Sequence, residues 1–131
     1  DRKKDALRRR GENVSSMELE AAILGHPAVA EVAVHAVASA ATEDDIKACV
    51  VLRPGAADPA PDELFAFFAD RLPYFAVPRY VELVAALPKN TLGRVLKHEL
   101  RARGVTGATW DFEELGLRVD PAGRRDGGGR R

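Results

Sequence analysis

The sequence predicts a small α+β domain, in which an N-terminal β-hairpin is followed by a three-stranded sheet covered by helices. Three observations support this class. The chain has 131 residues, 46% of them hydrophobic, which is enough for one domain with its own core. Two valine-rich runs, residues 29–37 and 46–52, have the composition and alternation of strands. Stretches with apolar residues at helical spacing lie before and after these runs.

The N-terminal elements are predicted from turn and cap residues. Residues 11–13, Gly-Glu-Asn, supply a turn for the hairpin, because glycine and asparagine tolerate positive φ. Ser15 or Ser16 is expected to cap the helix that follows, and Glu18 stands three residues after Ser15, as a capping box requires. We expect this helix to end at Gly25 and its apolar stripe to consist of Met17, Ala21, Ile23 and Leu24.

The sheet is predicted from the two valine-rich strands, which a short polar turn joins. Because the connection is short, we expect these strands to be antiparallel. Asp62 is the expected cap of a second helix. The apolar face of that helix is predicted to consist of Leu64, Phe65, Phe68 and Leu72.

The remaining segments complete the predicted domain. A third strand is expected at residues 79–83, and a last helix at residues 93–103, where arginines near the C-terminal end oppose the helix macrodipole. Residues 109–119 carry enough apolar side chains to dock as a terminal segment. Residues 120–131, rich in glycine and arginine, are predicted to be a disordered tail.

Composition excludes several classes of protein. The longest apolar run, residues 28–41, is broken by Glu31 and His35 and is shorter than the ~20 residues that span a bilayer, so no membrane span is expected. The single cysteine, Cys49, excludes an internal disulfide and fits a reducing cytosol. We therefore predict a cytoplasmic protein in which this thiol is buried and inert.

The histidines do not indicate a metal site, and no metal ligand is predicted. His26, His35 and His98 lie far apart in the sequence, and their spacing does not resemble that of metal ligands. We expect His26, which precedes a proline, and His98, on a polar helix face, to lie on the surface.

Charge is distributed unevenly along the chain. The total is zero, but residues 1–10 hold six Lys or Arg and two Asp, and residues 118–131 hold five Arg and two Asp, so the middle is acidic. Basic ends on an acidic body suggest contacts with anions such as phosphates at the ends. A further basic cluster surrounds Gly93 and could hold an anion through charge and free backbone N–H groups; it comprises Lys89, Arg94, Lys97 and Arg101.

Two segments, taken in order, point to a family. Residues 1–20, DRKKDALRRRGENVSSMELE, and residues 87–101, LPKNTLGRVLKHELR, resemble the C-terminal domain of acyl-CoA synthetases and related acid-adenylating, AMP-binding enzymes. The turn G-E-N and the segment P-K-N are most similar to those of acyl- or aryl-CoA ligases of the fatty-acid and carnitine type.

The resemblance implies a mobile cap domain at residues 1–119, with residues 1–5 as its hinge. It implies a partner, the N-terminal adenylation domain of the same polypeptide. The pair would adenylate a carboxylic acid with ATP and Mg²⁺ and then form a thioester with CoA, while this domain rotates between the two steps. ATP and CoA would bind mainly with the adenylation domain, and the 131 residues alone are predicted to be inactive.

The resemblance also assigns roles to single residues. Arg2 would contact the nucleotide ribose, Lys4 would be the hinge, and Gly11 would line the pantetheine tunnel, where a missing Cβ lets the backbone approach the ligand. Arg94 stands where most of the family has a catalytic lysine, and its planar guanidinium is not equivalent to an ammonium group. Three interpretations stay open: Arg94 does the work of that lysine, Lys97 replaces it, or adenylation is slow.

A third segment, residues 72–80 (LPYFAVPRY), matches a family stretch that lies near the CoA nucleotide. By this resemblance Tyr74 or Phe75 would stack on adenine and Arg79 would reach the 3′-phosphate. The alternative is that the two aromatic rings belong to the core and Arg79 is a solvated charge at an edge.

A function from another class also explains some features. A nucleic-acid-binding module would account for the basic N-terminus and the Arg/Gly-rich tail. The neutral total charge, the acidic middle and the lack of RNP-like aromatic strands argue against it, so we expect no nucleic-acid partner. A stand-alone interaction domain derived from a ligase is a second alternative.

Overall fold

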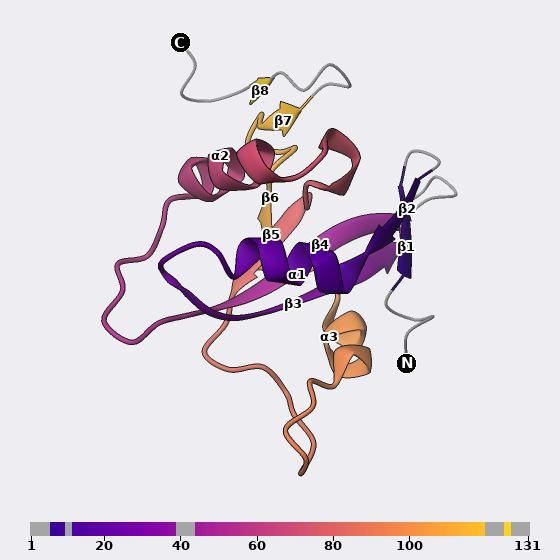
Figure 1. Cartoon of the computed structure of the whole chain (residues 1–131), viewed down its shortest axis with the longest axis vertical. Coiled ribbons are helices and arrows are strands. Elements are labelled where there is room, and N and C mark those ends of the chain that lie inside the picture. The colour runs from indigo at the N-terminus through magenta and orange to yellow at the C-terminus, as the bar shows by residue number, and fades with distance from the viewer. Residues whose placement is uncertain (1–5, 10–11, 39–43, 120–124, 127–131) are drawn as a thin grey trace.

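The computed structural model describes residues 6–9, 12–38, 44–119 and 125–126 (Figure 1). The helices in this part of the chain are α1 (Ser16–Ile23), α2 (Pro61–Arg71) and α3 (Lys97–Arg103), with a short 3-10 turn, η2 (Tyr74–Ala76). The strands are β1 (Ala6–Arg9), β2 (Glu12–Ser15), β3 (Val29–Ala38), β4 (Asp44–Leu52), β5 (Tyr80–Leu83), β6 (Trp110–Asp111), β7 (Arg118–Val119) and β8 (Arg125–Asp126). The predicted α+β class is confirmed.

The main sheet has the strand order β3-β4-β5-β6 in the described residues. β3 and β4 are antiparallel, as predicted, β4 and β5 are parallel, and β5 and β6 are antiparallel. The predicted hairpin is also present, with β1 antiparallel to β2. The three predicted strands are thus joined by a fourth, β6, which lies within the segment expected only to dock. Two residues are too few to show a strand period in a sequence.

Helices cover both faces of the sheet. Alternate residues of β4 point to opposite sides and therefore pack in two separate cores. Ile46, Ala48 and Val50 belong to the larger core, which α1 and α2 close with Leu19, Ile23, Leu64, Phe65 and Phe68. Ala33 and Cys49 belong to a smaller core with Leu100 of α3 and with Leu87, which precedes that helix in the chain. The result is a three-layer domain in which α3 lies on the face opposite α1 and α2.

The cap of α1 agrees with the prediction, whereas its apolar stripe agrees at Ile23 alone. The Ser15 hydroxyl accepts a hydrogen bond from the Glu18 N–H at 3.3 Å. Leu19 and Ile23, four residues apart, form the buried face, while Met17 and Leu24 are 62% and 45% exposed. The helix ends at Ile23 rather than at Gly25.

The face of α2 agrees with the prediction, whereas its cap does not. Leu64, Phe65 and Phe68 are buried as expected, whereas Leu72 follows the end of the helix and is partly buried. The helix begins at Pro61, because proline with its fixed φ suits the first helical position, so the cap is Ala60 rather than Asp62. The Ala60 N–H donates to the Glu63 carboxylate at 3.3 Å.

Cys49 is buried, as predicted, beside an imidazole. Its Sγ lies 3.9 Å from Nε2 of His35. Burial raises the pKa of the Cys49 thiol and lowers the pKa of His35, so both groups are held neutral. The prediction that His26 lies on the surface is wrong: it is 8% exposed and its ring packs edge-on against Phe67 at 4.8 Å.

Candidate functional site

The basic cluster around Gly93 lies in a loop that projects from the domain just before α3 (Figure 1). The predicted helix start at Gly93 is wrong, since α3 begins at Lys97. Gly93 has a φ of 84°, which a right-handed helix does not allow. The loop is closed instead as a narrow hairpin, in which Lys89 bridges to Val95 and the Leu96 N–H donates to the Pro88 carbonyl at 2.8 Å.

Arg94 lies near the tip of this loop. Its side chain is exposed and, among the residues that the structure describes, has no ion-pair or hydrogen-bond partner. Its backbone, by contrast, is held by Asn90: the Arg94 N–H donates to the Asn90 side-chain oxygen at 3.0 Å, and the Arg94 carbonyl accepts from the Asn90 N–H at 2.9 Å. A positive charge is therefore presented on a defined backbone.

Ion pairs fix both ends of the loop to the body of the domain. Lys89 Nζ lies 2.7 Å from a carboxylate oxygen of Glu31 on β3. Lys97 Nζ lies 2.8 Å from Oε2 of Glu20 on α1. The same Glu20 oxygen accepts the N–H of Val34 at 2.8 Å, so one carboxylate connects α1, β3 and α3.

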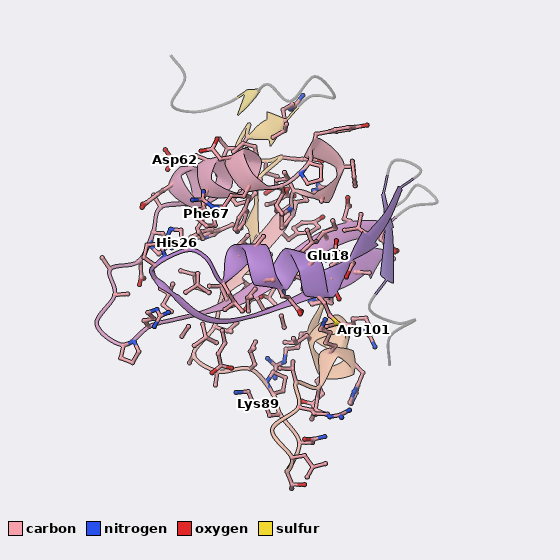
Figure 2. The ribbon with its side chains drawn as sticks, in the orientation of Figure 1. Glu18, His26, Asp62, Phe67, Lys89 and Arg101 are labelled. Atoms are coloured by element: carbon pink, nitrogen blue, oxygen red, sulfur yellow. The ribbon has the colours of Figure 1, made fainter. Side chains whose placement is uncertain are left out.

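The second candidate for the catalytic charge, Lys97, is therefore part of the support of the loop. Besides Glu20, its Nζ contacts the Ser16 hydroxyl at 3.2 Å, and its side chain is 16% exposed. In Figure 2, Lys89 and Arg101 lie at the end of the domain opposite Asp62 of α2, and the loop extends beyond them.

A buried lysine, which the sequence reasoning missed, holds the far end of α3. Lys47 is 1% exposed. Its Nζ donates to the Gly104 carbonyl at 2.6 Å, where it satisfies the C-terminal end of α3, and to a Glu82 carboxylate oxygen at 2.7 Å. The available signal was a lysine inside an apolar strand and a glutamate in the next strand.

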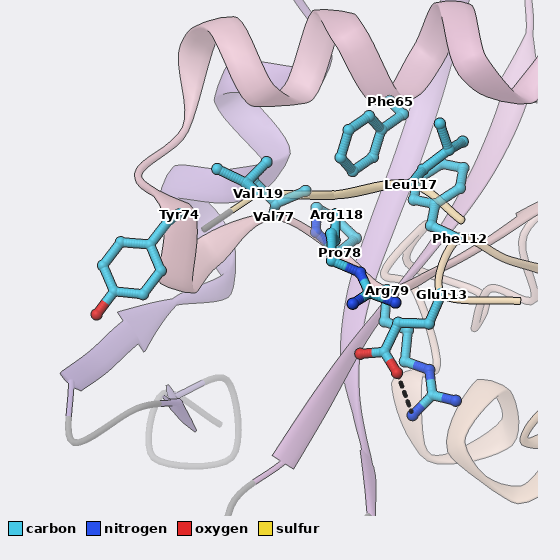
Figure 3. A pocket seen from close by; sticks show the side chains of 10 residues that line it. All are labelled: Phe65, Tyr74, Val77, Pro78, Arg79, Phe112, Glu113, Leu117, Arg118 and Val119. Atoms are coloured by element: carbon cyan, nitrogen blue, oxygen red, sulfur yellow. Dashed lines mark ion pairs between the residues drawn. The ribbon is translucent and has the colours of Figure 1, made fainter. Parts of the chain in front are cut away.

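The predicted CoA segment places Arg79 among carboxylates, of which Figure 3 draws Glu113. Arg79 pairs with Asp111 at 2.9 Å, with Asp45 at 3.2 Å and with Glu113 at 3.6 Å. Neither interpretation from the sequence, a phosphate ligand or a solvated charge, included these partners. Arg79 directly precedes β5, so its ion pairs connect the start of this strand to Asp45 on β4 and to Asp111 on β6.

The aromatic pair beside Arg79 is half-buried. The rings of Tyr74 and Phe75 meet edge to face at 5.6 Å, and Phe75 packs against the larger core. Tyr74 also lines a cavity of about 50 Å³ with Phe65, Arg79 and Phe112 (Figure 3). This volume accommodates about one or two water molecules, so an adenine ring would lie outside it.

Three predicted site residues, Arg2, Lys4 and Gly11, lie outside the described residues, as does the predicted hinge at 1–5. Of the predicted tail at 120–131, the structure describes residues 125–126 alone, which form β8. In the described ranges no three His, Cys, Asp or Glu side chains lie together as metal ligands would. No helix in these ranges has the length and apolar character needed to cross a bilayer.

Acid is expected to destabilise the domain through two carboxyl groups. Burial acts to raise the pKa of Glu82, but hydrogen bonds from Lys47 and Thr109 hold it below its ordinary 4.5. Burial likewise opposes the hydrogen bond and charge of Arg79, which hold the pKa of Asp111 below 3.8. A carboxyl whose folded pKa is depressed stabilises the fold fully above its unfolded pKa, and this stabilisation is lost as the pH falls through the folded value.

Urea unfolding should therefore give a free energy of unfolding that declines below about pH 4.5. Glu82→Gln should lower the free energy of unfolding at neutral pH and weaken its dependence on pH in the acid range. Glu114→Gln is the matched control, because that carboxyl is exposed and has no side-chain partner in the described part of the chain. Equal pH profiles for the two variants would contradict the role of Glu82.

The chain is similar to parts of longer proteins. The family described as AMP-binding enzyme C-terminal domain matches residues 18–94. A crotonobetaine/carnitine–CoA ligase of Salmonella arizonae is 37% identical over 101 residues, which cover 77% of this chain and 19% of that protein. The fatty acid–[acyl-carrier-protein] ligase ScoC of Streptomyces coeruleorubidus is 38% identical over 103 residues, or 79% and 20% of the two chains.

Solved structures agree with the sequence matches. ATP-bound MatB from Rhodopseudomonas palustris superposes with a TM-score of 0.71 at 34% identity, covering 77% of this chain and 20% of that one. The amide bond synthetase McbA from Marinactinospora thermotolerans gives 0.71 at 34% identity, covering 79% and 21%. The chain thus spans about a fifth of the length of these relatives. Because the family match covers more than half of its residues, this chain belongs to the family of C-terminal domains of AMP-binding enzymes.

Proposed function

We propose that this chain is the C-terminal domain of an ATP-dependent ligase that activates a carboxylic acid and passes the acyl group to CoA. The observation that carries the proposal is the exposed Arg94 guanidinium, presented on a loop whose two ends are tied to the domain by ion pairs. A fixed cation of this kind suits a reaction in which negative charge builds up at phosphorus.

In the first step, a carboxylate oxygen attacks the α-phosphorus of ATP, an O–P bond forms, and pyrophosphate leaves. Arg94 would donate hydrogen bonds to the reacting carboxylate and α-phosphate oxygens while charge accumulates on them. Arg94 suits this role better than Lys97, whose ammonium group is already bonded to Glu20 and Ser16. Mg²⁺ would enter with ATP, since the described residues offer no cluster of ligands for it.

In the second step, the CoA sulfur attacks the acyl carbon and AMP leaves as the thioester forms. Between the steps the domain would rotate about Lys4, so that the Arg94 face is replaced by the Gly11 face. Because Arg79 is neutralised by three carboxylates, we place the contacts with CoA at Gly11 and at the half-buried ring of Tyr74, with Phe75 supporting that ring from the core.

The division of labour between two domains is directly testable. We expect the isolated 131-residue chain to form no acyl-adenylate from ATP and a carboxylic acid, because its sequence contains no Ser/Thr/Gly-rich phosphate loop. The complete ligase, assayed in parallel by trapping acyl-adenylate with hydroxylamine, should form it with at least one acid. Product from the isolated chain would contradict the division of labour, and no product from the complete protein with any acid would contradict the ligase function.

A further inference from the structure

We propose that Asn90 is a positioning residue, whose side chain holds Arg94 in the conformation that adenylation requires. The inference rests on the proposed function of Arg94 and adds a second residue to it. Neither the charge of Asn90 nor its burial suggests such a role, because the residue is neutral and exposed. Its hydrogen bonds do.

The Asn90 side-chain oxygen accepts two backbone hydrogen bonds inside the loop. The donors are the N–H groups of Leu92, at 2.9 Å, and of Arg94, at 3.0 Å. The backbone of Asn90 adds two more, since its N–H donates to the Arg94 carbonyl at 2.9 Å and its carbonyl accepts from the Gly93 N–H at 3.0 Å. Both backbone groups of Arg94 are therefore bonded to one residue.

Asparagine suits this position because its carbonyl is short enough to reach the backbone two residues further on. Gly93, with φ at 84°, turns the chain so that the Arg94 N–H points back at the same oxygen. A Cβ at Gly93 would meet no atom within 4 Å, so glycine is needed here for its backbone conformation and not for space. Asn90 and Gly93 together define the turn that carries Arg94.

These bonds should matter for the rate of adenylation more than for the stability of the fold. The loop from Lys89 to Arg94 is exposed, and neither hydrophobic core includes any of its residues. Each bond competes with water, so its net contribution to folding is modest. A misplacement of about 1 Å at a reacting centre, by contrast, can cost about 100-fold in rate. Loss of the Asn90 side-chain oxygen would leave the Arg94 backbone held only through the N–H of residue 90, so the guanidinium would occupy a wider range of positions.

The test compares variants of the complete ligase in single turnovers over a range of ATP and acid concentrations up to saturation. Asn90→Ala should slow acyl-adenylate formation about 10- to 100-fold, with little change in the KM for either substrate. Asn90→Ser, which restores a weaker acceptor, should recover part of this loss. The matched control is Thr91→Ala, because Thr91 is exposed in the same loop and its side chain has no partner among the described residues.

A second measurement reports on the loop without any reaction. In the full 131-residue chain, Asn90→Ala should accelerate hydrogen exchange at the amides of Leu92 and Arg94 and leave the amide of Gly104, bonded within α3, unchanged. An Asn90→Ala ligase as fast as Thr91→Ala would overturn the inference while leaving the proposed function intact. A wild-type ligase that forms no acyl-adenylate would instead overturn the proposed function, and unaltered exchange at the two amides would overturn the positioning role by itself.

Discussion

Replacing Arg94 with alanine in the complete ligase is expected to slow acyl-adenylate formation by about 10²–10³-fold, the usual cost of removing one hydrogen-bond donor from a developing negative charge. Thioester formation from added acyl-adenylate should keep its rate, because Arg94 would have left the site by then. Rapid-quench measurement of the two half-reactions separates these effects. Arg94→Lys should retain much of the rate, since the positive charge is preserved.

The control for Arg94 is Arg103→Ala, which removes another exposed positive charge at the same end of the domain but outside the loop. An equal loss of rate in both variants would show a general electrostatic effect and contradict a specific role for Arg94.

Lys97→Met should lower the free energy of unfolding, because it leaves the Glu20 carboxylate without its cation. Loss of adenylation in Lys97→Met, with Arg94→Ala unaffected, would move the catalytic charge to Lys97.

Lys47→Ala should lower the free energy of unfolding by about 3–5 kcal/mol, the usual cost of removing one partner of a buried ion pair. Lys47 is 1% exposed, and its loss would leave the Glu82 carboxylate without its cation and the Gly104 carbonyl without the lysine donor. The C-terminal end of α3, the helix that follows the Arg94 loop, would then lose its hydrogen bond to β4. Urea unfolding followed by circular dichroism gives the free energy.

The matched control for Lys47 is Lys89→Ala, which breaks an ion pair of the same 2.7 Å length at the surface. Exposed ion pairs contribute about 0–1 kcal/mol to the free energy of unfolding. Because the two pairs have the same length, the difference between the variants reports the effect of burial. The double variant Lys47→Met, Glu82→Leu should recover part of the loss, because two apolar side chains leave no unpaired charge. A cost of Lys47→Ala no larger than that of Lys89→Ala would contradict the buried-pair account.

The sequence predicted those elements whose signals are local. Ser15 caps α1 as its spacing to Glu18 predicts, and the apolar residues Leu64, Phe65 and Phe68 lie on one face of α2. The strands β3 and β4 follow from their valines and from the short connection between them. In each case the residues that determine the structure lie within a few positions of one another.

The features that were missed depend on residues distant in the sequence. β6 forms because Trp110 pairs with Val81, and a strand of two residues is too short to show an alternating pattern of apolar and polar side chains. The start of α3 is the exception: Asn90, only four residues before Arg94, closes a turn first, so the helix begins at Lys97 rather than at Gly93. The contacts that support the candidate site also join residues distant in the sequence. Lys97 pairs with Glu20, whereas the sequence alone presents Lys97 as another cation beside Arg94.

The measurement that tests the central claim most directly is acid-dependent ATP–pyrophosphate exchange by the complete ligase, with and without this domain. We predict exchange that requires a carboxylic acid and falls by at least about 10²-fold when the domain is removed, because the Arg94 charge is removed with it. Exchange that survives removal of the domain unchanged, or that no carboxylic acid elicits from the complete protein, would contradict the account.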